Sequence, residues 1–193
     1  ATAIDWMERE RIPDSAIRTG IRRLCEARRR RETAGGCEQR LARQQAFIRR
    51  MDDGPIAPVP EKANEQHYEL PAEFFRHVLG HRLKYSGCRF ETPDAGLDLA
   101  EDASLAATCG HANLADGQRV LELGCGWGSL TLWMAAQYPS SRITAISNSA
   151  PQRAFIEARA AERGLDNVRV MTADINDFEP DDGPFDRVVS IEM

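Results

Sequence analysis

An acidic residue followed by three alternating glycines is the feature of this sequence best suited to chemistry. The run Glu-Leu-Gly-Cys-Gly-Trp-Gly occupies residues 122–128 and follows an apolar pair at 120–121. The glycines permit a tight turn and let a ligand approach the backbone where a Cβ atom would block it. The carboxylate of Glu122 can accept hydrogen bonds from a cationic or hydroxylated ligand. A strand, a glycine turn and a helix in this order are typical of a nucleotide-type cofactor site.

Alternating strand-like and helical segments surround this turn and must position it. The alternation predicts an α/β fold, namely a Rossmann-like, doubly wound and mostly parallel sheet, incomplete after its fourth strand. Ligands of such sheets bind at the carboxyl ends of the strands, where the glycine turn lies. A parallel sheet that stops there leaves an apolar edge, so we expect the sequence to be the first part of a longer protein. The expected strands are 119–123, 142–147, 168–171 and 185–191, and the expected intervening helices are 129–138 and 151–164.

Composition divides the chain into four segments. Residues 1–54 show helical periodicity and form an N-terminal arm or cap, and residues 55–63 form a linker whose prolines forbid regular helix. Residues 64–116 form a second helical segment, and residues 117–193 hold the first half of the alternating core. Within the third segment we expect a helix over 97–114, with its inward residues being Leu99, Ala103, Leu105, Ala106 and Cys109.

Charge is distributed unevenly along the chain, whose net charge is −5. Residues 1–60 hold 13 arginines against 9 acidic residues, a balance of +4, whereas residues 61–193 hold 12 basic against 21 acidic residues, a balance of −9. This acidic body argues against a broad nucleic-acid-binding face. The four arginines at 28–31 are compatible with a peripheral contact to phosphate or anionic lipid, although the flanking Glu26 and Glu32 favour an ordinary solvated helix end.

Signals for metals and membranes are weak. The five cysteines are scattered without a C-x-x-C pair, which argues against a zinc site or a disulfide framework and favours a reducing, cytoplasmic location. His77 and His81 have the i, i+4 spacing that could face one metal, but no acidic or cysteine partner is obvious nearby, so we expect no metal site. We expect no signal peptide, and no apolar run approaches the ~20 residues of a transmembrane helix.

The glycine pattern distinguishes two classes of cofactor. A nicotinamide dinucleotide site requires G-x-G-x-x-G and an acidic residue ending the second strand. Here position 129 is Ser, and the second strand ends Ile-Ser-Asn at 146–148 without a carboxylate. The pattern E-x-G-x-G-x-G instead resembles motif I of the class I S-adenosylmethionine-dependent methyltransferases. The Thr-Ala-Asp-Ile run at 172–175 stands where that family carries its adenine-binding Asp.

A narrower resemblance rests on four short runs. His-Tyr-Glu-Leu-Pro at 67–71, Lys-Tyr-Ser at 84–86, Gly-Cys-Gly-Trp-Gly at 124–128 and Asn-Ser-Ala-Pro-Gln at 148–152 resemble the cyclopropane-fatty-acid synthase superfamily. This group includes the mycolic acid methyltransferases and the coclaurine N-methyltransferase-like enzymes. The resemblance implies that S-adenosyl-L-methionine is the cofactor and that segment 64–116 supplies a cofactor lid and substrate-side residues. The implied cofactor residues are Tyr85 and Ser86 in the lid, Glu122, Gly124, Cys125, Gly126 and Gly128 around the methionine part, Ser147, Asn148 and Gln152 at the ribose, and Asp174 and Ile175 at the adenine.

Two departures favour the coclaurine N-methyltransferase-like branch. The lid of cyclopropane synthases carries a run similar to Tyr-Ser-Cys, in which the Cys helps to hold a bicarbonate base. This chain has Gly87 at that position and Cys88 one position later. Cyclopropane synthases also tend to carry Gly at the position of Glu192, while Ser-Ile-Glu-Met at 190–193 resembles the coclaurine branch. In that branch Phe-Glu-His follows, and its Glu-His pair is implicated in handling the amine proton. Glu192 is the catalytic candidate inside this sequence, with a purely structural strand end as the equal alternative, and the principal pair is expected just after Met193.

The resemblance therefore implies methyl transfer from S-adenosylmethionine to a small apolar amine. The sulfonium is already a strong electrophile, so the protein mainly aligns donor and acceptor while a base takes the amine proton. One alternative is methyl or methylene transfer to unsaturated fatty acyl chains, as in cyclopropane-fatty-acyl-phospholipid synthases. A second is a truncated, non-catalytic chain that binds a cofactor or a partner. The arm is expected to cover an acceptor pocket lined by Tyr68, Phe74, Phe75 and Phe90.

Overall fold

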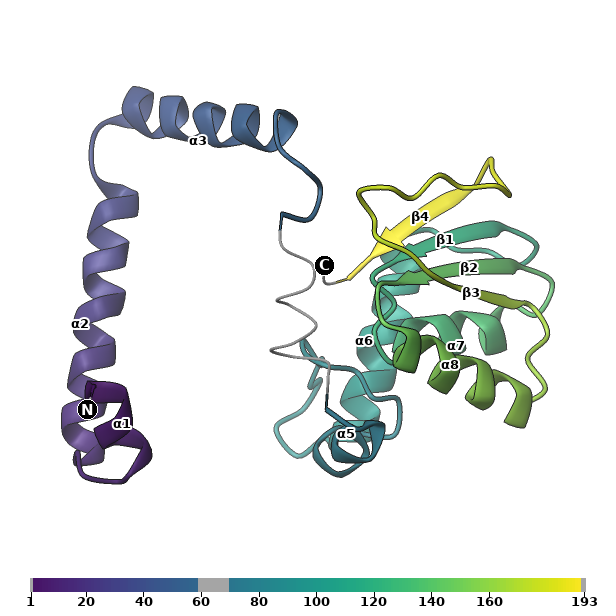
Figure 1. Ribbon diagram of the computed structural model, residues 1–193, viewed down its shortest axis with the longest axis horizontal. Helices are drawn as coiled ribbons and strands as arrows, with labels where there is room; N and C mark the ends of the chain where they lie inside the picture. The colour runs from purple at the N-terminus through teal and green to yellow at the C-terminus, as the bar shows by residue number, and fades with distance from the viewer. Residues whose placement is uncertain (1, 59–69, 192–193) are drawn as a thin grey trace. The chain divides into compact units, whose positions relative to one another are not determined.

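The computed structural model describes residues 2–58 and 70–191 and divides the chain into two compact units, Ala1–Gly54 and Pro55–Met193 (Figure 1). Two residues singled out above, Tyr68 and Glu192, lie outside the described residues. Within the described part, no helix is both long enough and apolar enough to cross a bilayer.

The N-terminal unit consists of three helices. They are α1 (Ala3–Glu8), α2 (Asp14–Thr33) and α3 (Cys37–Asp52). The arginine run lies in α2, where its side chains pair with glutamates one turn away along the same helix: Arg29 and Arg30 with Glu26, and Arg28 with Glu32. Such exposed i, i+3 and i, i+4 pairs stabilise a helix only slightly. They neutralise much of the local charge without involving any other element.

The second unit contains the predicted parallel sheet. Its strand order is β3-β2-β1-β4, and every neighbouring pair is parallel. The predicted α/β sheet is therefore confirmed, although the fourth strand is shorter than residues 185–191. The strands are β1 (Arg119–Leu123), β2 (Arg142–Ser147), β3 (Val168–Thr172) and β4 (Arg187–Ser190).

Helices α6 (Leu97–His111), α7 (Ser129–Gln137) and α8 (Ala150–Glu162) lie on one side of this sheet (Figure 1). The short helix α5 (Ala72–Val78) precedes them. Met134 of α7 is fully buried against Val120 of β1 and Ile143 of β2 in the main hydrophobic core. The core is thus built between the first two strands and the helix that follows the glycine turn, which fixes the turn from both of its ends.

Helix α6 buries only part of the expected set of inward residues: Leu105 and Cys109 are buried as predicted, and Ala103 is half-buried. Leu99 is 68% exposed and Ala106 is also exposed, so their predicted inward positions were wrong. The buried positions include Glu101, Leu105 and Cys109, whose spacing of four residues keeps them on one face of the helix. The carboxylate of Glu101 is buried on this face because it finds backbone N–H partners there, as described below.

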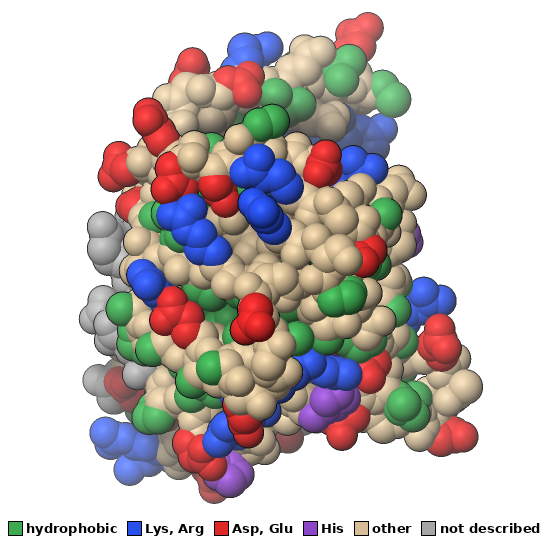
Figure 2. All heavy atoms as spheres, turned by 90° about the vertical axis from the view of Figure 1, so that its right-hand side faces the viewer, with side chains coloured by type: hydrophobic (Ala, Val, Ile, Leu, Met, Phe, Trp, Pro, Cys, Tyr) green, Lys and Arg blue, Asp and Glu red, His purple; other side chains and the backbone are tan. Residues whose placement is uncertain are grey.

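The surface of the molecule that faces the viewer in Figure 2 carries acidic and basic side chains intermixed, with small hydrophobic areas between them. No patch of a single charge sign dominates the described residues of this face. The acidic excess of the second half of the chain is therefore not gathered into one patch on this face.

The third glycine of the turn is required for packing between helices. Gly128 precedes α7 with φ +80°, and a Cβ atom at this position would lie 2.6 Å from Cγ1 of Ile156 on α8. Gly126 has φ +53° but open space around a Cβ atom. The two glycines therefore share a left-handed backbone conformation and differ in their steric surroundings.

We predict that Gly128→Ala destabilises the protein more than Gly126→Ala does. Both variants place a Cβ in the left-handed region, at a cost of roughly 1–2 kcal/mol. Only Gly128→Ala also forces Ile156 aside, which adds about 1–3 kcal/mol. Urea unfolding of the two variants and the wild type measures the difference, and equal losses would contradict the packing role of Gly128.

Candidate functional site

The glycine turn is held at the carboxyl end of β1 by the neighbouring strand. The backbone N–H groups of Gly124 and Cys125 both donate to the carbonyl oxygen of Ile146, at 3.0 and 2.9 Å. Gly124, Gly126 and Gly128 all have positive φ, a conformation that other residues adopt only with strain. The turn is therefore a fixed loop between two strands and a helix.

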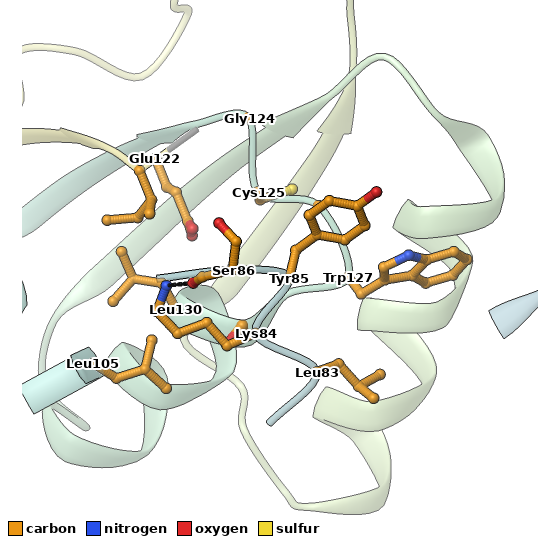
Figure 3. Close-up of a pocket in the computed structure, with 13 residues that line it drawn as sticks. Leu83, Lys84, Tyr85, Ser86, Leu105, Glu122, Gly124, Cys125, Trp127 and Leu130 are labelled. Atoms are coloured by element: carbon orange, nitrogen blue, oxygen red, sulfur yellow. Dashed lines mark hydrogen bonds between the residues drawn. The ribbon is translucent and has the colours of Figure 1, made fainter. Parts of the chain in front are cut away.

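A cavity lies between this turn and the segment that precedes α6 (Figure 3). In Figure 3 the Glu122 side chain points from β1 toward the lid residues Tyr85 and Ser86. The structure thus brings together two predicted groups that are nearly forty residues apart in sequence. The predicted residues that line this cavity are Tyr85, Ser86, Glu122, Gly124, Cys125 and Gly126.

Glu122 is a buried carboxyl group of this cavity whose pKa is raised. It is 3% exposed, and its carboxylate accepts a hydrogen bond of 2.6 Å from the hydroxyl of Thr131 on α7. Burial raises the pKa of Glu122 from 4.5 to about 7, and the Thr131 hydroxyl only partly offsets this effect. Burial also raises the pKa of the Cys125 thiol, so Cys125 is a neutral, small apolar lining residue and not a nucleophile.

The lid segment, residues 80–86 between α5 and α6, is anchored by a residue that the sequence analysis missed. Glu101 of α6 is fully buried and accepts three backbone hydrogen bonds, from the N–H groups of Gly80, Arg82 and Lys84. The Lys84 ammonium in turn donates to the carbonyl oxygen of Ser86. The sequence signal for this role is the position of Glu101, four residues before Leu105 on the same face of an apolar helix. A carboxylate buried at such a position needs hydrogen-bond partners.

The residues predicted at the ribose lie at the carboxyl end of β2, outside the cavity between turn and lid. The Ser147 hydroxyl donates to Oε1 of Gln152 at 2.6 Å and accepts from the Ser149 N–H at 3.1 Å. Gln152 is 3% exposed, whereas Asn148 is exposed. Ser147 and Gln152 are therefore held together by the first turn of α8.

The residues predicted at the adenine follow β3 on the same edge of the sheet. Asp174 and Ile175 are half-buried, and Asp174 accepts the N–H of Asn176 at 2.8 Å. Asn176 exchanges two hydrogen bonds with the backbone of Ala57, at 3.0 and 2.8 Å. Residue 57 is thereby tied to the loop after β3, a contact that the sequence pattern did not indicate.

Several buried polar atoms around the turn have no hydrogen-bond partner among the described residues. They include Nε1 of Trp127, Oγ of Ser129 and Nε2 of Gln152. Unpaired buried donors are uncommon in proteins and usually indicate a missing water or ligand. Together with the open space beside Gly126, they fit a site that receives a polar ligand.

Histidine and acidic residues approach one another beside the lid. His81 Nδ1 lies 3.1 Å from Asp98, and Glu101 is close enough to complete a possible three-residue metal site. However, both oxygens of Glu101 already accept backbone N–H groups, and Asp98 accepts the N–H of His81 at 2.9 Å. His77 faces Glu73 instead, so the i, i+4 histidine pair does not converge on one point.

The aromatic residues expected around an acceptor pocket have different environments. Phe75 is 2% exposed and packs on Trp127, with ring centroids 5.1 Å apart, so it supports the lid from within. Phe74 and Phe90 are exposed and remain accessible from solvent.

Comparison with known sequences places these features in context. Residues 59–193 match the family described as mycolic acid cyclopropane synthetase. The (S)-coclaurine N-methyltransferase of Thalictrum flavum subsp. glaucum is 36% identical over 182 residues, which are 94% of this chain and 50% of that protein. The chain spans about half the length of the curated relatives it matches.

Two solved structures resemble the chain to different extents. A coclaurine N-methyltransferase bound to N-methylheliamine and S-adenosylhomocysteine (SAH) gives a TM-score of 0.91 at 36% identity, covering 98% of this chain and 54% of that one. A mycolic acid cyclopropane synthase complexed with SAH and CTAB gives 0.60 at 32% identity, covering 68% and 46%. These likenesses, with the parallel sheet, confirm the predicted Rossmann-like fold and the predicted superfamily.

The raised pKa of Glu122 predicts a pH-dependent stability. The folded-state pKa lies above that of the unfolded chain, so the stabilisation from the protonated form is fully present below pH ~4.5 and is lost as the pH rises through about 7. The free energy of unfolding should decrease by about 3 kcal/mol across this window because of Glu122. Glu122→Gln should remove that decrease.

Urea unfolding at several pH values measures the effect as the difference between wild type and variant. The control is Glu179→Gln in the loop after β3, which removes an exposed carboxylate that forms no ion pair among the described residues. A wild type and Glu122→Gln variant with parallel pH profiles would show that the Glu122 carboxyl titrates normally.

Proposed function

The chain belongs to the mycolic acid cyclopropane synthetase family, and from this premise we propose that the protein is an S-adenosylmethionine-dependent methyltransferase acting on a small apolar amine. The observation that carries the proposal is the convergence of the glycine turn, the Glu122 carboxylate and the lid on one cavity at the carboxyl end of β1. A cavity at this end of a parallel sheet is where such folds bind their ligands.

In this proposal the cofactor supplies an electrophilic methyl group, and the chain binds and orients it. The glycine turn and Glu122 hold the methionine part, with the carboxylate stabilised in its ionised form by a cationic ligand. Tyr85 and Ser86 close over the cofactor and exclude water. Ser147, Asn148 and Gln152 hold the ribose, and Asp174 and Ile175 hold the adenine.

The four segments of the chain have separate tasks in the same proposal. Residues 1–54 cap the acceptor side, residues 55–63 link this cap to the rest, residues 64–116 supply the lid, and residues 117–193 form the cofactor-binding half of the core. Glu192 is the proposed base inside this sequence, since in the sequence it comes two residues after Ser190, the last residue of β4.

The extent of similarity supports an amine acceptor. The likeness to coclaurine N-methyltransferase covers 94% of the chain in sequence and 98% in structure, including the arm, whereas the likeness to the mycolic acid cyclopropane synthase structure covers 68%. The arm is the part expected to cover the acceptor. Similarity that extends into this part is evidence about the acceptor, whereas similarity in the core concerns the cofactor.

Transfer of a methyl or methylene group to an unsaturated acyl chain is the second candidate, because the family is described by its lipid-modifying members. The arginine run of α2 would then contact lipid headgroups. The pairing of Arg28, Arg29 and Arg30 with glutamates of their own helix makes this contact weaker than the sequence alone indicates.

We predict that methyl-labelled S-adenosylmethionine transfers its label to amines. The purified protein is incubated with a panel of small apolar amines and, separately, with unsaturated phospholipid vesicles, and the products are identified by mass spectrometry. Label found only in fatty acyl chains would overturn the amine assignment. The absence of label in both panels would favour a chain that binds cofactor without catalysis.

We also predict that Gly126→Val abolishes cofactor binding, because its side chain fills the space beside the turn. The matched control is Gly117→Val, where the glycine also has positive φ and open surroundings but precedes β1, at the opposite end of the strand. Calorimetric titration with SAH should show no binding for Gly126→Val and near wild-type affinity for Gly117→Val. Unchanged affinity of Gly126→Val would refute the location of the site.

A further inference from the structure

The lid segment has no regular secondary structure, yet alternate N–H groups along it converge on one carboxylate. Oε1 of Glu101 accepts the N–H groups of Gly80 at 3.1 Å and Lys84 at 2.9 Å, and Oε2 accepts that of Arg82 at 2.7 Å. Glu101 is 0% exposed, so no water competes for these bonds. The path of residues 80–84 is thus set by a single side chain of α6.

A carboxylate suits this position better than any uncharged side chain. An ionised carboxylate only accepts hydrogen bonds and offers about four lone-pair directions, whereas an amide of the same shape must present two donors. Hydrogen bonds from N–H to a charged acceptor are also stronger than neutral ones. In the glutamine variant, at least one backbone N–H of the lid would face another donor.

The lid backbone is closely fitted to this carboxylate. A Cβ atom at Gly80 would lie 2.6 Å from both Cδ and Oε2 of Glu101, so only glycine permits this approach. Leu83 has φ +55°, which is unfavourable for leucine, and its side chain is buried against Phe75 and Trp127. The segment holds this conformation because the carboxylate and the apolar cluster fix it from two sides.

The anchor is continuous with the residues that line the cavity. Lys84 is 7% exposed, its N–H bonds to Glu101, and its ammonium donates to the carbonyl oxygen of Ser86. Tyr85 and Ser86 therefore directly follow Lys84, whose N–H is anchored on Glu101 and whose ammonium also binds the backbone of Ser86. Glu101 itself does not line the cavity.

We propose that Glu101 is a positioning residue for the cofactor lid, acting through the backbone of residues 80–84 to place Tyr85 and Ser86 over the cofactor. This role rests on the proposed function, since the lid has a cofactor to cover only if the cavity binds one. A displacement of about 1 Å at such a position can reduce function by ~10²-fold even when the altered residue does not touch the ligand. Loss of the Glu101 carboxylate is therefore expected to weaken binding of the cofactor and to leave binding of the acceptor unchanged.

The test compares Glu101→Gln with Asp102→Asn, its neighbour on α6. Asp102 pairs with the Arg82 side chain at 2.8 Å, whereas the backbone N–H groups of residues 80, 82 and 84 donate to Glu101, so Asp102 controls for loss of charge beside the same segment. SAH affinity is measured by calorimetry, melting temperature by thermal unfolding, and amide exchange of residues 80–86 by mass spectrometry. Glu101→Gln should weaken SAH binding by roughly 10- to 100-fold and speed exchange across the lid, with the KM of the acceptor unchanged. Asp102→Asn should retain wild-type SAH affinity.

Each other outcome has a definite meaning. A lower melting temperature with unchanged SAH affinity would show that Glu101 only stabilises the fold, which overturns the positioning role. If Glu101→Gln does not fold, Gly80→Ala provides the same test, because it keeps the carboxylate and displaces it from the lid. Wild-type protein that binds no SAH would overturn both the proposed function and this role. Normal SAH binding by the wild type, by Glu101→Gln and by Gly80→Ala would overturn this role alone.

Discussion

The carbonyl oxygen of Ile146 accepts two consecutive backbone N–H groups of the glycine turn, and the rest of the site depends on this contact. It fixes the turn to β2 where β1 ends, so that α7 starts directly after Gly128 and runs back along the sheet. The direction of α7 then brings Thr131 to Glu122 and places Ile156 of α8 against Gly128. One backbone arrangement thereby defines the cavity wall, the environment of its carboxylate and the packing of two helices.

Two buried carboxylates of this unit have different tasks because they have different partners. Glu101 receives three backbone N–H groups and serves as a structural acceptor. Glu122 receives one hydroxyl and lines the cavity, so burial dominates and raises its pKa to about 7. A carboxyl group that is incompletely satisfied within the protein is suited to interact with a ligand, whereas a saturated one is suited to hold a loop.

The sequence predicted those parts of the structure that local pattern determines. The strand bounds of β1 and β2 follow from short apolar runs between turn residues, and the glycine turn follows from its spacing. On α6 the burial of Leu105 and Cys109 was predicted correctly, but Leu99 was wrongly placed inward because hydrophobicity favours it, whereas tertiary N–H donors favour burial of Glu101. The bonds between Ala57 and Asn176 join residues 119 positions apart, and no local pattern encodes such a contact.

The lid also bears on the choice between amine and lipid acceptors. Gly87 stands at the position where, by the resemblance, cyclopropane synthases carry a Cys that helps to hold bicarbonate. Gly87 has φ +69°, a conformation that cysteine would adopt only with strain. Its carbonyl oxygen accepts the Ser104 hydroxyl at 2.9 Å, so the backbone at this point is tied to α6. Cys88 does not replace that thiol, because it is displaced by one residue and burial raises the pKa of its thiol. At residues 87 and 88 the lid therefore departs from the cyclopropane-synthase pattern, which is consistent with the proposed amine acceptor, since methylation of an amine needs only a proton acceptor for its own N–H.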